Sequence, residues 1–236
     1  MDILGSLAGI ILMSPLFLVT AMAIKLTSSG PVFYRQVRVG RFGRHFRIFK
    51  FRSMVANAEH QGSRVTARDD QRITPLGMFL RRHKLDEFPQ LLNVLLGQMS
   101  LVGPRPEVPE FVAAYPRRFD RILKVRPGIT HRATLLFRNE EELLAGADDT
   151  RAMYVNTILP WKLRIYGEHM QRQSLLDDVR TILDTIFLRH RPIERVETPL
   201  ANPQIDNIRP FPANVDERRP VLGAAEELRR TASLNS

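Results

Sequence analysis

Two adjacent carboxylates, Asp86 and Glu87, are the residues of this sequence best suited to chemistry. Pro89 follows them, and because proline is tolerated only in the first turn of a helix, a helix should begin close to Asp86. The unpaired N–H groups at a helix start favour anions, so we expect Asp86 to have a low pKa and to stay ionised. An ionised aspartate can attack phosphorus and form an acyl phosphate.

Glu87 can have a different task from its neighbour. On a helix, successive side chains point about 100° apart. One acid can therefore attack while the other binds a hard cation such as Mg²⁺, which accepts one or two carboxylates together with substrate phosphates. The simpler alternative is structural: Asp86 caps the helix and Glu87 is a favourable charge in its first turn.

Nearby basic residues favour the chemical interpretation. Arg105 lies between two prolines, in a stiff loop that suits bidentate capture of phosphate oxygens. Arg81 precedes the acids, and Lys50 and Arg52 end a predicted hairpin. Each base alone could be a solvated surface charge. Together with the acid pair and an apolar N-terminus, they indicate phosphoryl transfer at a bilayer surface.

The overall composition also fits an anionic partner. The chain has 236 residues, a formal net charge of +10 and a sequence pI of about 10.7. This balance favours nucleic acid, anionic lipid or phosphorylated substrates. The absence of cysteine excludes disulfides and thiolate metal sites, and the six histidines show no metal-ligand spacing.

The N-terminus is apolar, with no charged residue from Ile3 to Ile24. As a straight helix this stretch would be roughly 33 Å long, about the thickness of a bilayer core. A cleaved signal peptide is disfavoured because many basic residues follow, and these place the next domain in the cytoplasm. Pro15 should kink the helix, and Ser14 could bond the freed carbonyls. The segment then either spans the membrane or dips in and returns to the same face.

The remaining pattern predicts a mostly helical chain with one β-hairpin. Alternating and aromatic residues predict strands at 32–39 and 45–51, and Thr74-Pro75 marks a helix start. Further elements are predicted as helices at 53–62, from Asp86 to Gly97, at 139–149 and over 151–190 with a break near Pro160, and as a turn at 126–130. Apolar residues at helical spacing between 175 and 186 fit core packing, our first expectation, or a membrane surface.

Three ordered motifs resemble the bacterial sugar transferase family. They are KFRSM (50–54), LDEFPQLLNVLLGQMSLVGPRP (85–106) and RPGIT (126–130). The apolar N-terminus with its Ser-Pro pair, followed by GPVFYRQVRVG, is similar to the family's opening. The resemblance covers roughly residues 2–190 and is highly specific. His131 and Arg132 follow RPGIT where relatives often have Gly-Leu, which leaves the sugar open.

The resemblance implies a monotopic polyprenyl-phosphate phosphoglycosyl transferase. The expected fold is α+β, mostly helical with a small β-hairpin, and the expected membrane helix is re-entrant and broken at Ser14 and Pro15. Such an enzyme transfers a sugar-1-phosphate from a nucleotide sugar, usually UDP-linked, to a polyprenyl phosphate such as undecaprenyl phosphate, and releases UMP. Its product starts exopolysaccharide, O-antigen or glycoprotein glycan synthesis.

Residue roles follow from the resemblance in the same way. Asp86 is expected to be the nucleophile that carries a covalent phosphosugar, and the acid pair Asp86 and Glu87 is expected to hold Mg²⁺, chiefly through Glu87. The expected phosphate contacts are Lys50, Arg81 and Arg105, with Arg52 a weaker candidate.

The expected organisation has three parts. Residues 1–25 form the re-entrant helix, residues 26–190 the transferase domain on the cytoplasmic face of the bacterial inner membrane, and residues 191–236 a proline-punctuated, unstructured tail. The expected partners are UDP-sugar, polyprenyl phosphate, membrane lipid and downstream glycosyltransferases, but no nucleic acid. A hypothesis from another class is a membrane-anchored basic adaptor that binds anionic lipid or nucleic acid without chemistry.

Overall fold

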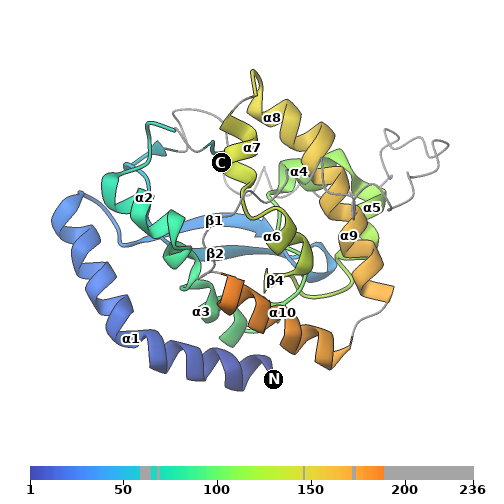
Figure 1. Cartoon of the computed structure of the whole chain (residues 1–236), viewed down its shortest axis with the longest axis horizontal. Helices are drawn as coiled ribbons and strands as arrows, with labels where there is room; N and C mark the ends of the chain where they lie inside the picture. The colour runs from blue at the N-terminus through green and yellow to red at the C-terminus, as the bar shows by residue number, and fades with distance from the viewer. Residues whose placement is uncertain (59–64, 68–69, 146, 172–173, 189–236) are drawn as a thin grey trace.

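A computed structural model describes residues 1–58, 65–67, 70–145, 147–171 and 174–188 (Figure 1). The predicted tail at 191–236 lies outside these residues. The described chain is mostly helical, with two small two-stranded sheets, as the sequence predicts for the fold class. The α-helices are α1 (Asp2–Thr27), α2 (Pro75–Arg82), α3 (Gln90–Leu95), α4 (Pro109–Ala114), α5 (Pro116–Ile122), α6 (Arg132–Leu136), α7 (Glu140–Ala145), α8 (Thr150–Met153), α9 (Leu159–Gln171) and α10 (Leu175–Leu188). The other elements are strands β1 (Phe33–Val39), β2 (His45–Phe51), β3 (Ser100–Val102) and β4 (Gly128–Thr130), the 3₁₀ turns η1 (Arg41–Gly43) and η3 (Leu85–Glu87), and the π-helical turn η4 (Tyr154–Ile158).

The predicted hairpin is confirmed. Strands β1 and β2 pair antiparallel, with Phe33 opposite Phe51 at one end of the ladder. On β2, Phe46 and Ile48 are buried in a cluster with α3. Because alternate residues of a strand share a face, Lys50 points to the same side, toward the acid pair.

The predicted turn at 126–130 is wrong in its second half. Residues Gly128–Thr130 form β4, which pairs in parallel with β3. A Cβ atom on Gly128 would lie 2.1 Å from the Gly103 nitrogen, so only glycine permits this close approach of the two backbones. The strand pair was missed because each strand is only three residues long and the partner is distant in sequence.

Helix α1 continues through Pro15 and bends midway along its length (Figure 1). The Ser14 Oγ donates a hydrogen bond of 2.8 Å to the Ile11 carbonyl, the acceptor that a proline at position 15 leaves free. The predicted kink and its serine bond are therefore confirmed. The helix is long and apolar enough to cross a membrane, and most of it is exposed.

Both halves of α1 lie against the rest of the protein. In the first half, a Cβ atom on Gly5 or Gly9 would meet Leu101 or Leu91, at 2.8 and 3.1 Å, so the helix backbone lies directly on these leucines. In the second half, Phe17 packs edge-on against Phe51 with ring centroids 5.5 Å apart.

Two helix predictions need correction. Residues 53–58 do not form the predicted α-helix, because Met54 bridges to Ile73 and Asn57 takes a positive φ of 63°. The rest of the predicted segment, 59–62, lies outside the described residues. The chain also stays helical through Pro160, because η4 precedes it and helices accommodate proline by such local changes of pitch. The helical run ends at Gln171 instead.

The first expectation for residues 175–186, packing on the core, is also wrong. The main core lies between α4 and α9, around residues such as Phe111, Phe119 and Tyr166. The apolar side chains of α10 are largely exposed instead, for example Leu176 at 82% and Phe187 at 66%. The other face of α10 contacts β4 through a 2.6 Å hydrogen bond between the Thr185 and Thr130 hydroxyls. An exposed apolar face of this kind is typical of a helix at a membrane surface.

Candidate active site

The acid pair lies in the 3₁₀ turn η3, not at the start of a regular α-helix. Lys84 precedes it with a positive φ of 53°, which turns the chain sharply after α2. Asp86 is 5% exposed, and its Oδ1 is buried without a hydrogen-bond partner. It makes no capping bond. The predicted helix from Asp86 to Gly97 is therefore confirmed only in part, because the regular α-helix α3 begins at Gln90 and the acid pair lies in the 3₁₀ turn before it.

The pKa of Asp86 is raised rather than lowered. Burial is the main cause, and the neighbouring charge of Glu87 adds to it, while the Lys50 ammonium opposes both. The expectation of a low pKa is wrong because it assumed the backbone donors of a helix start, which Asp86 does not have. A carboxylate in this position is poorly solvated. It is therefore a reactive group when it ionises.

Glu87 is held by two cations. Arg105 donates hydrogen bonds to both carboxylate oxygens, from Nη1 to Oε2 at 3.0 Å and from Nη2 to Oε1. The Lys50 Nζ also donates to Oε1, at 2.9 Å. Burial opposes ionisation, but these two cations hold the pKa of Glu87 well below its usual range. Arg105 and Lys50 therefore favour the ionised form of Glu87 beside Asp86.

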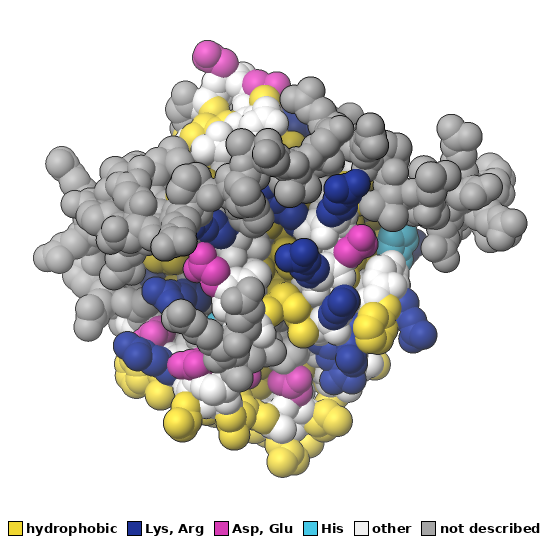
Figure 2. All heavy atoms as spheres, turned by 90° about the vertical axis from the view of Figure 1, so that its right-hand side faces the viewer, with side chains coloured by type: hydrophobic (Ala, Val, Ile, Leu, Met, Phe, Trp, Pro, Cys, Tyr) yellow, Lys and Arg dark blue, Asp and Glu magenta, His cyan; other side chains and the backbone are white. Residues whose placement is uncertain are grey.

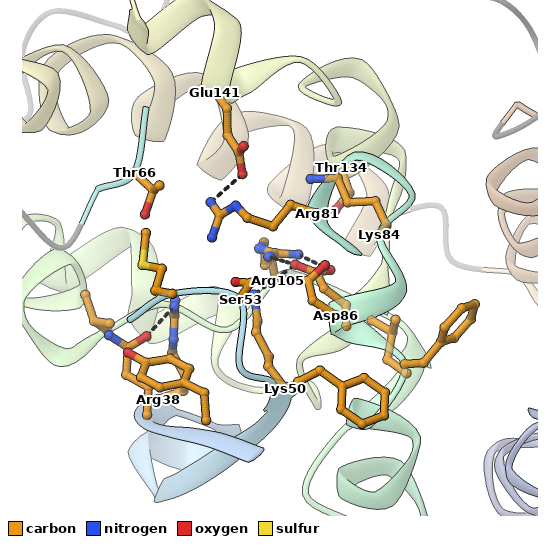
Figure 3. Close-up of a pocket in the computed structure, with 18 of the residues that line it drawn as sticks. Arg38, Lys50, Ser53, Thr66, Arg81, Lys84, Asp86, Arg105, Thr134 and Glu141 are labelled. Atoms are coloured by element: carbon orange, nitrogen blue, oxygen red, sulfur yellow. Dashed lines mark hydrogen bonds and ion pairs between the residues drawn. The ribbon is translucent and has the colours of Figure 1, made fainter. Parts of the chain in front are cut away.

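These residues line a cavity of about 1300 Å³. Its walls come from the β1–β2 hairpin, from α2 and η3, from the loop around Arg105 and from the region of α6 and α7. Figure 3 shows Lys50, Arg105 and Asp86 converging on one region, with Arg81 and Glu141 above them in that view.

Arg81 reaches the same cavity from α2. This helix starts as predicted, because the Thr74 side chain accepts a hydrogen bond from the Gly77 N–H at 2.9 Å. The Arg81 guanidinium bonds to Glu141 of α7, with a distance of 2.6 Å between Nη2 and Oε1. Arg81 thus lies on the cavity wall, but it does not contact the acid pair in the way that Lys50 and Arg105 do.

Arg52 has a different environment from the other predicted cations. It is 7% exposed, and its guanidinium donates to the Ser28 and Ser29 carbonyls and to the Ser28 hydroxyl at 2.7–2.9 Å. These groups directly follow the C-terminal end of α1. Arg52 also lines the cavity, so its predicted phosphate contact stays a prediction, but its bonds in the structure anchor α1.

A second set of cavity residues was not predicted from the sequence. The Glu107 carboxylate is 4% exposed and accepts a 2.6 Å hydrogen bond from the Tyr154 hydroxyl. Lys162 is 3% exposed, pairs with Glu140 and lies 5.0 Å from the Tyr154 ring centroid. All four line the cavity. Only the position of Glu107 directly after the Pro-Arg-Pro loop could have indicated its place; Lys162 and Tyr154 lie in unremarkable helical sequence.

The acid pair suits a metal ion whose remaining ligands come from water and substrate rather than from the protein. Within the described residues, no three or more His, Asp or Glu side chains gather as a metal site. Asp86 Oδ1 is nevertheless a buried oxygen without a partner, and Glu87 Oε2 accepts only one bond among those described. Two such carboxylates fit Mg²⁺, which completes its shell with water and phosphate oxygens.

The chain was compared with known families and proteins. Residues 1–191 match the family described as Bacterial sugar transferase. The chain belongs to this bacterial sugar transferase family. The match includes the kinked helix, the acid pair and the Arg105 loop.

Several curated family members are similar to the chain. It is 46% identical over 154 residues to the UDP-N-acetylgalactosamine-undecaprenyl-phosphate N-acetylgalactosaminephosphotransferase of Aeromonas hydrophila, covering 64% of this chain and 36% of that protein. It is 36% identical over 190 residues to the UDP-glucose:undecaprenyl-phosphate glucose-1-phosphate transferase of Escherichia coli K12, covering 79% and 38%. A putative undecaprenyl-phosphate N-acetylgalactosaminyl 1-phosphate transferase of Bacillus subtilis is 41% identical over 132 residues, covering 56% and 70%. The chain thus spans little more than a third of the first two of these relatives.

Proposed function

We propose that this protein transfers a sugar-1-phosphate from a UDP-sugar to undecaprenyl phosphate or a related polyprenyl phosphate. The observation that carries the proposal is Asp86, a buried carboxylate with an unpartnered oxygen in a large basic cavity, beside an ionised Glu87. The names of the relatives support the substrate classes, and they include different sugars, glucose and N-acetylgalactosamine. The sugar used by this protein is therefore left open.

The proposed reaction has two displacements at phosphorus. A carboxylate oxygen of Asp86 attacks the β-phosphorus of the UDP-sugar, the bond from that phosphorus to the bridging oxygen breaks, and UMP leaves with the electron pair. An oxygen of the polyprenyl phosphate then attacks the phosphorus of the acyl phosphate. The bond to Asp86 breaks, the carboxylate is restored, and polyprenyl-diphosphate sugar is released.

The surrounding residues have complementary roles in this proposal. Arg105 and Lys50 lie close enough to the acid pair to bind the diphosphate oxygens, and Arg81 can reach the same phosphates by leaving Glu141. We also propose that Mg²⁺ is held by Asp86 and Glu87 together with substrate phosphates. When bound, it would neutralise charge that develops on the phosphate oxygens.

We further propose that α1 is re-entrant and that the catalytic domain lies at the cytoplasmic face of the inner membrane. The Asp2 carboxylate, at the first turn of α1, accepts hydrogen bonds from the Ser100 hydroxyl at 3.0 Å and the Leu101 N–H at 3.2 Å. Arg52 binds the other end of the helix. Both ends thus bond to the same domain, whereas a spanning helix would separate them by a bilayer.

The proposal is tested by UMP release. Protein in nanodiscs is supplied with Mg²⁺, polyprenyl phosphate and each of a panel of UDP-sugars. At least one sugar nucleotide should give UMP, and Asp86→Asn should abolish release while leaving membrane association intact. Asp120→Asn, a change at an exposed aspartate of α5, is the matched control and should be fully active. Full turnover by Asp86→Asn would contradict the assignment of Asp86 as the nucleophile.

A further inference from the structure

We propose that an apolar part of the cavity, between α3, the β3–β4 pair and α10, binds the first isoprene units of the polyprenyl acceptor. This inference rests on the proposed function and locates one of its substrates. We call this part the apolar arm and define it by the cavity-lining residues Phe88, Leu91, Leu101, Ile129, Ile182 and Ile186.

The apolar arm is made by α3 with the turn before it, by strands β3 and β4, and by α10. Phe88 and Leu91 come from the turn and helix that directly follow the acid pair, and Leu101 and Ile129 come from the paired strands β3 and β4. Ile182 and Ile186 come from α10, which is fastened to β4 by the Thr185–Thr130 hydroxyl bond. An apolar ligand in this space would exchange water for aliphatic contacts on several sides, which is the favourable setting for a hydrocarbon chain.

The arm also borders the surface that would face lipid. Leu91 and Leu101 are the same two leucines on which Gly9 and Gly5 of α1 lie. Ile186 lines the cavity and is still 50% exposed. In Figure 1, α3 lies between α1 and α10 at the lower side of the molecule, and in Figure 2 hydrophobic side chains gather along that lower edge. A chain could therefore pass from the membrane into the arm without crossing a polar surface.

The inner end of the arm has the opposite character. Phe88 and Leu91 are two and five residues after Asp86, and the same cavity holds Lys50 and Arg105. A ligand that fits both parts must have an apolar chain that ends in an anionic head. Polyprenyl phosphate has this form, and with its chain in the arm, its phosphate would lie toward the acid pair. A sugar nucleotide has no apolar chain and cannot make use of the arm.

The test compares acceptors of different chain length. Wild-type protein should use undecaprenyl phosphate far better than a short isoprenyl phosphate. The measure is the ratio of kcat/KM for undecaprenyl phosphate to kcat/KM for the short isoprenyl phosphate. Ile182→Asn places an amide in the arm and should reduce this ratio by about tenfold or more. Leu176→Asn makes the same change on α10 at a side chain that is 82% exposed and does not line the cavity, and should keep the wild-type ratio.

Donor-only turnover separates this proposal from the proposed function. Without acceptor, Ile182→Asn should release the same initial burst of UMP as wild type, because the donor does not use the arm. A normal burst with an unchanged chain-length ratio would overturn the apolar arm alone. Absence of any UMP from wild-type protein with every donor would overturn the proposed function instead.

A labelling experiment covers the case in which the asparagine variant fails to fold. The chain has no cysteine, so Ile182→Cys introduces a single thiol. Undecaprenyl phosphate should slow the reaction of this thiol with a maleimide at least about fivefold in nanodiscs, whereas the short isoprenyl phosphate should not. The thiol of Leu176→Cys should react at the same rate with or without either acceptor. Binding in the arm would be contradicted if undecaprenyl phosphate protected the thiols at positions 182 and 176 equally, or protected neither of them.

Discussion

Replacement of Arg52 by methionine should loosen α1 from the domain with little effect on donor binding. The guanidinium makes three hydrogen bonds to the segment that ends α1, at 2.7, 2.8 and 2.9 Å, and it is 7% exposed. A hydrogen bond to a charged group contributes about 1.5 to 3 kcal/mol. Because Ser29 is exposed and water can replace part of these bonds, we expect a total loss of about 3 kcal/mol.

The loss is measured as a change in thermal stability in nanodiscs or detergent. For a domain of this size, about 3 kcal/mol corresponds to a fall in Tm of roughly 6 to 12 °C. Arg52→Lys keeps the positive charge but not the planar guanidinium, so its Tm should lie between those of the wild type and Arg52→Met. Arg47→Met removes an exposed arginine of the same strand and should leave Tm nearly unchanged. An unchanged Tm for Arg52→Met together with a raised KM for the sugar nucleotide would refute the anchoring role and support a phosphate contact.

Three further predictions concern the cavity and the kink. Arg105→Ala should lower kcat/KM for the sugar nucleotide about 30-fold or more in UMP-release assays, since it removes a bidentate contact; unchanged kinetics would contradict it. Lys50→Met removes the cation that opposes the raised pKa of Asp86, so the acid limb of the pH–rate profile should move to higher pH; a shift to lower pH would contradict an ionised Asp86 as nucleophile. Pro15→Leu should straighten α1 and expose its N-terminus to reagents added at the opposite membrane face, whereas the wild-type N-terminus should be labelled only from the cytoplasmic side.

Features encoded by a few neighbouring residues could be predicted from the sequence. The hairpin follows from local alternation of side chains, and its two strands lie at the predicted positions. Thr74 caps α2 because a threonine before a proline provides both the acceptor and the fixed backbone angle. Ser14 bonds to the carbonyl that Pro15 leaves free, a contact three residues back along the chain.

Features that depend on distant partners could not be predicted. The β3–β4 pair joins residues 28 positions apart through two short strands, from Ser100 to Gly128. The buried Tyr154–Glu107 bond joins residues separated by 47 positions, and neither residue has a local signal of its place in the cavity.

The chemical state of the acid pair illustrates the same limit. The family motifs correctly grouped Lys50 and Arg105 with the acid pair in one site, although Lys50 lies 37 positions from Glu87. The sequence did not indicate that both cations would hold Glu87, or that Asp86 would be buried with an unpartnered oxygen. The direction of a pKa shift depends on burial, and burial at this position is decided by the packing of the whole cavity.

The central claim is that Asp86 becomes bonded to phosphorus during turnover. Protein is mixed with its UDP-sugar in the absence of polyprenyl phosphate, quenched rapidly and digested for mass spectrometry. We predict that the peptide containing position 86 gains the mass of the sugar phosphate, that Asp86→Asn does not, and that adding polyprenyl phosphate before the quench removes the adduct. Product formation at the normal rate with no adduct on that peptide at any time point would contradict the account.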